Sequence, residues 1–372
     1  MKELNYGIRE KTEYSQMQYA AIDNAKLIFS ILVVALHCGP LSVINSEISY
    51  YFTQCVTRIA VPFFFICNGF FAFSYPPPPK NGTAILRQCV KLIRMYVIWT
   101  IIYIPGFIST YSECDHPIKA AIVGFVTGKS YSHLWYLAAA AVALLLTSVA
   151  YRTFKSWKKV LMLAGVLYII GLSYDSYYGV FRALAIWNVT AIHTVAKGAL
   201  SVIQTTRDGV FFGFFFVAAG AVVAKYHEEI QKALCKKGAI LSFTFGMVEV
   251  VIVRLAGWQR RQDAVDMYLF LVPTSVFLFC WLLKSDNAKP ISHSNIRKES
   301  TLIYLIHIWV RTIWLRLCIP VLSKFPVDNI HLICENAMVV FIVDVVASFL
   351  LAKLYVQVSL TKRGKWLRKW IA

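Results

Sequence analysis

Acidic side chains are scarce in this sequence. The 372 residues include 38 Lys and Arg but only 19 Asp and Glu, so the formal net charge is +19. In a soluble protein such an excess would suggest nucleic acid as a partner. The chain is also 58% hydrophobic, above the roughly 45–50% of soluble domains, and its mean hydropathy is +0.59. We therefore expect no nucleic-acid partner, and interpret the positive charge as basic loops at the cytoplasmic face of a membrane.

Paired cysteines are missing too. The nine cysteines occur singly, without the CxxC or His/Cys spacings that bind zinc. The sequence therefore predicts no metal site, and most of the thiols are interpreted as small apolar groups within helices. Cys114, Cys318 and Cys334 fall near the expected outer face and are candidates for one disulfide.

The sequence also lacks a cleavable signal peptide and internal repeats. Residues 1–21 are polar and mixed in charge, so the first apolar run is predicted to be retained. The absence of a repeat gives no support to an inverted-repeat transporter. The segment 174–207 is long for a connection, and is interpreted either as a lid or re-entrant element or as a disordered loop.

Long apolar runs predict an all-α polytopic membrane protein. Lys and Arg concentrate in the loops on one side, which places both termini in the cytoplasm. We expect a cytoplasmic segment 1–21, a membrane domain 22–357 and a basic cytoplasmic tail 358–372. About ten transmembrane helices are expected, over residues 22–44, 51–74, 85–105, 133–150, 158–173, 208–224, 239–256, 266–284, 300–320 and 334–357.

Ionisable residues inside these runs are the main functional signal, because charge in hydrocarbon is expensive. Lys26 and His37 lie eleven positions apart in the first run, so they share a helix face to within roughly 20° and are separated by roughly 16 Å. His37 and Arg58 are each expected about 10 Å below the outer edge, on neighbouring helices. An arginine beside His37 would favour the neutral, proton-accepting imidazole. The bland alternative is a buried histidine bonded to a backbone carbonyl.

A second cluster lies at the cytoplasmic mouth. Arg87, Lys91 and Arg94 follow a four-three spacing on one helix face. Snorkelling to lipid headgroups explains them if they act alone. With Lys26, they are candidates for a basic cup that binds the phosphates of a soluble cofactor.

The remaining candidates are weaker. Tyr304, His307 and Arg311 share one helix face. Glu249 and Asp344 are predicted near mid-membrane, as counter-ions for Arg58, Arg254 or Arg311. Trp135 is a further substrate candidate, although an interfacial aromatic belt explains it adequately.

The sequence resembles the membrane-bound acyltransferase 3 family over essentially its whole length. The resemblance rests on the order and spacing of several segments: Lys26-x10-His37, RIAVPFFFICNGFF (58–71), the basic pair Lys91 and Arg94, HLWYL (133–137), GVFFGFFFVAAG (209–220) and STLIYLIH (300–307). It implies ten helices, an acyl-CoA donor such as acetyl-CoA used from the cytoplasm, and an essential His37. Lys26 stands where the family often has arginine, and Asn68 where it commonly has serine.

The membrane halves of serine racemases from vancomycin-resistance operons are similar as well. In those proteins this domain is thought to supply serine, and a soluble pyridoxal-phosphate domain follows. The present chain ends at Ala372, so we expect no racemase chemistry from it.

The favoured hypothesis is an O-acyltransferase of the bacterial cytoplasmic membrane, in contact with the lipid bilayer. His37, tuned by Arg58, would be its catalytic group, and Lys26, Arg87, Lys91 and Arg94 would bind the donor. The resemblance implies an envelope polysaccharide or glycolipid as the acceptor, and no tightly bound cofactor is expected. A small amino-acid permease module and a catalytically silent scaffold remain alternatives.

Overall fold

The computed structural model describes residues 19–74, 82–184, 205–230, 234–261, 265–285, 294–322, 330–361, 363, 364 and 367. Within these residues the chain forms helices and contains no strand, so the all-α prediction is confirmed. Most of the segment 174–207, interpreted above as a lid or re-entrant element or as a disordered loop, lies outside the described residues. All nine cysteines are free, so the candidate disulfide among Cys114, Cys318 and Cys334 is not formed.

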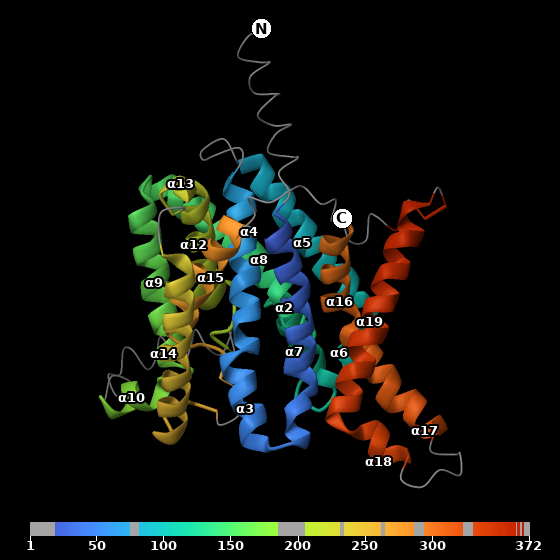
Figure 1. Cartoon of the computed structure of the whole chain (residues 1–372). Coiled ribbons are helices and arrows are strands. Elements are labelled where there is room, and N and C mark those ends of the chain that lie inside the picture. The colour runs from blue at the N-terminus through green and yellow to red at the C-terminus, as the bar shows by residue number, and fades with distance from the viewer. Residues whose placement is uncertain are drawn as a thin grey trace.

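The helices form a bundle in which α2, α5 and α16 begin at the same end of the molecule (Figure 1). The longer helices are α2 (Ala20–Cys38), α3 (Ser46–Cys55), α4 (Ala60–Ser74), α5 (Gly82–Ile102), α7 (Pro117–Val126), α8 (Trp135–Phe154), α9 (Trp157–Ser173), α12 (Phe214–Lys225), α14 (Cys235–Leu255), α15 (Leu271–Ser285), α16 (Ser294–Ile313) and α19 (Ala337–Leu360). The shorter ones are α6 (Ile104–Tyr111), α10 (Tyr178–Ala183), α13 (His227–Ile230), α17 (Ile319–Leu322) and α18 (Ile330–Glu335). Short 3₁₀ helices occur at η1 (Pro40–Val43) and η2 (Thr57–Ile59), and short π-helices at η4 (Gly209–Gly213) and η5 (Trp314–Cys318).

Length and composition make this a multi-pass membrane protein. Among the described residues, six stretches are long and apolar enough to cross a membrane: Ala20–Cys38, Ser46–Ser74, Trp135–Phe154, Cys235–Leu255, Asn295–Leu322 and Ala337–Leu360. A seventh arises if α5 and α6, which are bent by 78°, count as one span. Pro117–Val126, Gly209–Lys225 and Leu271–Ser285 are shorter apolar helices. Ten spans and cytoplasmic termini therefore stay predictions.

The first two apolar runs are interrupted where the site residues lie. The helix expected over 22–44 ends at Cys38, because Gly39 adopts a left-handed conformation with φ 58° and Pro40 opens a short 3₁₀ turn. The run expected over 51–74 is divided into α3 and α4 by the turn η2, which carries Arg58. His37 thus occupies the last turn of α2, and Arg58 lies just before α4.

Small residues bring α4 against α12. A Cβ on Gly69 would overlap the carbonyl oxygen of Val217, and a Cβ on Gly220 would overlap the carbonyl oxygen of Ile66. Membrane helices use such small residues for close backbone contact. Arg58, just before α4, and Arg207, just before η4 and α12, reach the same carboxylate of Asp266.

Candidate functional site

His37 and Arg58 line one small cavity, which we call the histidine cavity, with a volume of about 50 Å³. The structure therefore brings the two residues to one place, as their depth in adjacent runs predicts. Polar and aromatic side chains from the rest of the bundle complete its wall: Thr57, Ser132, His133, Trp135, Tyr136, Arg207, Asp266 and Tyr304.

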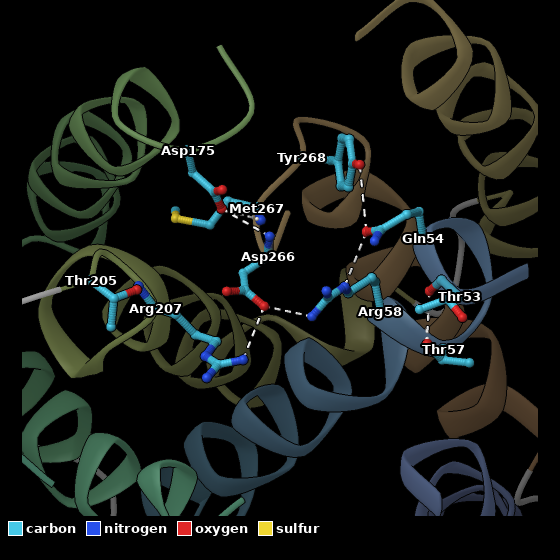
Figure 2. A network of polar contacts seen from close by, with 10 residues as sticks. All are labelled: Thr53, Gln54, Thr57, Arg58, Asp175, Thr205, Arg207, Asp266, Met267 and Tyr268. Atoms are coloured by element: carbon cyan, nitrogen blue, oxygen red, sulfur yellow. Dashed lines mark hydrogen bonds and ion pairs between the residues drawn. The ribbon is translucent and has the colours of Figure 1, made fainter. Parts of the chain in front are cut away.

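Arg58 is held by Asp266. Its Nη1 lies 2.5 Å from Asp266 Oδ1, and Arg207 Nη1 lies 3.1 Å from the same oxygen. Figure 2 shows the carboxylate between the two guanidinium groups. Arg58 Nε also donates to Gln54 Oε1 at 3.2 Å. One carboxylate shared by two cations fixes both of them and leaves an excess of positive charge beside His37.

The segment that carries Asp266 is held in turn by Asp175. Asp175 Oδ2 accepts hydrogen bonds from the backbone N–H of Asp266 at 2.9 Å and of Met267 at 2.8 Å (Figure 2). Burial and the Asp266 carboxylate raise the pKa of Asp175 above its usual range. Asp175 therefore positions the ion-pair network rather than facing the cavity itself.

Three imidazoles lie together. The ring centroids of His37 and His307 are 5.3 Å apart, and those of His133 and His307 are 5.1 Å apart. His307 Nδ1 lies 2.8 Å from the carbonyl oxygen of Tyr304, and His133 Nε2 lies 3.3 Å from that of Leu305. Because a carbonyl only accepts, these nitrogens carry the protons. The buried His307 Nε2 and His133 Nδ1 have no protein partner among the described residues, so each offers a lone pair near His37.

Arg311 anchors the end of α2, since its Nη1 donates to the carbonyl oxygen of His37 at 2.6 Å. The expected ion pairs with Asp344 and Glu249 are wrong for the described part of the chain. Asp344 accepts hydrogen bonds from Ser348 Oγ at 3.0 Å and from Cys38 Sγ at 3.6 Å.

Glu249 binds backbone instead. It accepts from the N–H groups of Leu269 at 2.7 Å and Phe270 at 2.8 Å, and from the Tyr177 hydroxyl at 2.8 Å. Arg254 pairs with Glu47 at 2.5 Å. Nearby donors thus satisfy the carboxylates of Glu249 and Asp344. Arg254 and Arg311 bind other partners, Glu47 and the carbonyl oxygen of His37.

A larger cavity of about 570 Å³, the basic cavity, opens between the first turns of α2, α5 and α16. Its cations are Lys26, Arg87, Lys91 and Arg297. Arg94 is exposed and does not line it. Arg297 was not expected here, because the sequence places it in a run of cytoplasmic loop charges.

One acidic residue, Asp23, organises two of these cations. Asp23 is 2% exposed, its Oδ2 lies 2.6 Å from Arg297 Nε, and its Oδ1 lies 3.7 Å from Lys26 Nζ. Lys26 also lies 4.6 Å from the centre of the Phe71 ring. Arg87 and Lys91 form no ion pair with a described carboxylate, so the cavity retains positive charge suited to phosphates.

Two tyrosines belong to both cavities. Tyr136 and Tyr304 line the basic cavity and the histidine cavity alike. The Tyr136 hydroxyl accepts from Asn68 Nδ2 at 2.7 Å, and the Tyr304 hydroxyl donates to the carbonyl oxygen of His133. The two rings therefore form a wall between the cations and His37.

A third cavity of about 400 Å³, the Lys129 cavity, adjoins the histidine cavity on the other side. Both are lined by Ser132, Trp135 and Arg207. Thr110, Lys129, Tyr131 and Thr205 complete its lining. The guanidinium of Arg207 lies 5.0 Å from the centre of the Trp135 ring. The three cavities thus follow one another through the bundle, with His37 in the middle one.

This arrangement can bind an anion at the basic cavity and place a proton acceptor beside a second, separate cavity. Among the described residues no group of three or more His, Cys, Asp or Glu could hold a metal ion. Sequence reasoning missed Arg207, Asp266 and Arg297 as site residues. Arg207 and Asp266 lie at the ends of apolar runs, where a charge normally faces water.

Comparisons with known proteins find one family model and several relatives that match this chain. The model of an acyltransferase domain matches residues 19–355. The serine/alanine racemase of Enterococcus gallinarum is 30% identical over 305 residues, which cover 78% of this chain and 40% of that protein. Two amino-acid racemases of Enterococcus faecalis are 29% identical over 270 residues and 26% identical over 341 residues. The matches cover 36% and 45% of those two proteins, so the chain spans less than half the length of these relatives. No solved structure matches the chain.

Proposed function

We propose, because the chain belongs to the acyltransferase family whose domain model matches residues 19–355, that it transfers an acyl group across the wall between the basic and histidine cavities. The donor is an acyl-CoA, with acetyl-CoA as the simplest case. The acceptor is a hydroxyl group of a cell-envelope glycan or glycolipid. The site of action is the bacterial cytoplasmic membrane.

The observation that carries the proposal is the series of three cavities with His37 in the middle. The basic cavity supplies Arg87, Lys91, Lys26 and Arg297 for the phosphates of CoA. Its volume of about 570 Å³ falls within the range of roughly 300–1,000 Å³ for small-molecule sites. The thioester end of the donor reaches His37 past Tyr136 and Tyr304.

His37 acts as the general base in this proposal. It takes the proton of the acceptor hydroxyl, the oxygen attacks the thioester carbonyl, and the C–S bond breaks. The protonated imidazole then returns the proton to the departing CoA thiolate. General-base assistance contributes about 10²–10⁴-fold, so positioning of the two substrates supplies much of the remaining acceleration.

The neighbouring groups support that chemistry. Arg58 and Arg207 lie on the wall of the histidine cavity, where they stabilise negative charge on the thioester oxygen in the transition state. His307, whose ring centroid lies 5.3 Å from that of His37, has an unpartnered Nε2 that is an acceptor for an N–H of protonated His37. Arg311 holds the backbone at His37 and so fixes the height of the imidazole.

A second candidate function is uptake of a small amino acid. Two observations favour it: the racemase names of the relatives, and cavities that continue on both sides of His37. In that case the same charges line a path for serine, and CoA is not consumed.

One experiment separates the two functions. Purified protein in liposomes is given acetyl-CoA labelled in the acetyl group together with envelope material, and serine flux is measured in parallel. We expect labelled acetyl in the envelope material, reduced at least 100-fold by His37→Ala. His116→Ala is the matched control, since His116 is exposed just before α7. Serine flux without CoA release would overturn the acyl-transfer proposal.

A further inference from the structure

The Lys129 cavity contains two cationic side chains with unused hydrogen-bond donors. Lys129 Nζ and Arg207 Nε are buried, and neither has a partner among the described residues. Both residues line the same cavity of about 400 Å³. A buried charged donor without a hydrogen-bond partner costs more free energy than an exposed one, because water satisfies the exposed donor. Two such donors at one cavity indicate that a ligand satisfies them.

The backbone at Lys129 is fixed on both sides. Its N–H donates to the carbonyl oxygen of Gly124 at 2.6 Å, and its carbonyl oxygen accepts from the Tyr111 hydroxyl at 2.7 Å. The backbone from which the Lys129 side chain extends is therefore fixed in the loop between α7 and α8. Arg207 is fixed separately, through the ion pair of its Nη1 with Asp266 at 3.1 Å.

Among the described residues, no ion pair joins Lys129 to a carboxylate. Asp266 is already shared by Arg58 and Arg207. The charge of the Asp208 carboxylate raises the pKa of Lys129, but the two side chains form no ion pair. The Asp208 carboxylate instead caps η4, where its Oδ1 accepts from the N–H groups of Val210 and Phe211 at 2.8 Å.

We propose that the Lys129 cavity binds the carboxylate or phosphate group of an anionic ligand between Lys129 and Arg207. Tyr131 and Trp135 line the same cavity and contact the body of the ligand. Within the proposed function, this ligand is the acceptor, and its hydroxyl then reaches His37 past Ser132 and Trp135. The same chemistry suits the carboxylate of a free amino acid.

The charge of Lys129 depends on pH near neutrality. Burial lowers the pKa of Lys129 to about 8, with a smaller lowering by Arg207 and an opposing effect of Asp208. The other titratable groups beside it are Tyr111, on its carbonyl oxygen, and Tyr131, in the cavity lining. Since the ammonium loses its proton as pH rises through about 8, anion binding weakens from about pH 7 to about pH 9.

The test measures binding to purified protein in lipid nanodiscs, without CoA, by calorimetry at fixed ionic strength. The probes are D-glucuronate with D-glucose as its neutral match, and L-serine with L-serinamide as the match without a carboxylate. We expect at least one carboxylate probe to bind at least tenfold more tightly than its match, because hydrogen bonds to charged groups are the strong ones. Lys129→Gln should weaken that binding about tenfold, and Lys129→Arg should retain it. Lys119→Gln is the control at an exposed lysine of α7 and should have no effect.

The outcomes separate the sources and the hypotheses. Binding of D-glucuronate supports an anionic envelope acceptor, and binding of L-serine alone supports a free amino acid. Lys129-dependent binding in a protein that transfers no acetyl group upholds this site and overturns the proposed function instead. Equal binding of each probe and its match, or full binding by a folded Lys129→Gln variant, would overturn the inference.

Discussion

The rings of Tyr136 and Tyr304 lie edge to face with their centroids 5.8 Å apart, and both rings line the basic cavity and the histidine cavity. Their hydroxyls point to different anchors, Asn68 on α4 for Tyr136 and the carbonyl oxygen of His133 for Tyr304. The wall between the basic cavity and the histidine cavity is therefore made of two side chains from α8 and α16 rather than of backbone. In the proposed function, the donor therefore passes between two side chains and no helix has to be displaced.

Tyr136→Trp should block the passage of a thioester. The larger indole ring takes more of the boundary that Tyr136 shares with Tyr304. We therefore expect the acetyl-transfer rate to fall about 100-fold, since misplacement of the thioester by about 1 Å costs that much. Binding of CoA itself should not change, because the phosphate-binding cations lie elsewhere in the basic cavity. Tyr136→Phe is the matched control and should retain most activity. Equal loss of CoA binding and of acetyl transfer in Tyr136→Trp would contradict a passage for the thioester between Tyr136 and Tyr304.

Charge removal inside the basic cavity should weaken donor binding selectively. Arg87 and Lys91 line that cavity, whereas Arg94, one turn further along α5, does not. We expect Arg87→Gln and Lys91→Gln each to raise the KM for acetyl-CoA about tenfold, since a charge-assisted hydrogen bond contributes about 1.5–3 kcal/mol. Arg94→Gln should change it less than about twofold. Steady-state kinetics on the three variants decide the point, and an equal effect of all three would indicate general surface attraction.

Much of the fold could be predicted from hydropathy alone. The apolar run at 158–173 is α9 (Trp157–Ser173), and the run at 239–256 is α14 (Cys235–Leu255). Apolar length marks helix positions because lipid requires every backbone group to be paired within the helix. The break at Gly39 and the turn η2 at Arg58 were missed, since short interruptions barely change the hydropathy of a run.

The histidine and its nearest arginine could also be predicted, but their partners could not. Lys26, His37 and Arg58 lie close together in the sequence, so helix periodicity and short connections place them. Asp266 is 208 residues from Arg58, and Arg207 is 59 residues from Asp266. Such pairs depend on which helices pack together in the bundle. The sequence offered Glu249 and Asp344 as counter-ions because they lie at mid-membrane depth, and backbone donors and hydroxyl groups satisfy them instead.

Removal of the Asp266 carboxylate should destabilise the protein more than removal of an exposed one. Asp266→Asn leaves Arg58 and Arg207 without their shared counter-ion. Breaking a buried pair in this way costs about 3–5 kcal/mol. Glu47→Gln is the matched control, because the Glu47 side chain is 54% exposed where it pairs with Arg254, and exposed pairs contribute about 0–1 kcal/mol. Thermal unfolding in detergent compares the two variants, and equal shifts in Tm would mean that water screens the Asp266 network as well.

Close packing of α4 against α12 should be essential for the site, because it sets Arg58 beside Arg207. A Cβ on Gly220 would overlap the carbonyl oxygen of Ile66 and approach the backbone nitrogen of Phe70 to 2.8 Å, and backbone does not yield as a side chain does. Gly220→Ala should therefore force the helices apart and destabilise the fold by about 1–3 kcal/mol, the usual cost of overpacking.

The control is Gly165→Ala on α9. There the added Cβ meets only the Phe215 ring at 3.7 Å, an ordinary contact, and alanine also favours a helix over glycine by about 1 kcal/mol. Gly165→Ala should leave Tm unchanged or raise it, while Gly220→Ala lowers Tm and acetyl transfer together. If Gly220→Ala kept full activity, the distance between α4 and α12 would not control the geometry at Arg58, and Asp266 alone would have to hold the two arginines in place.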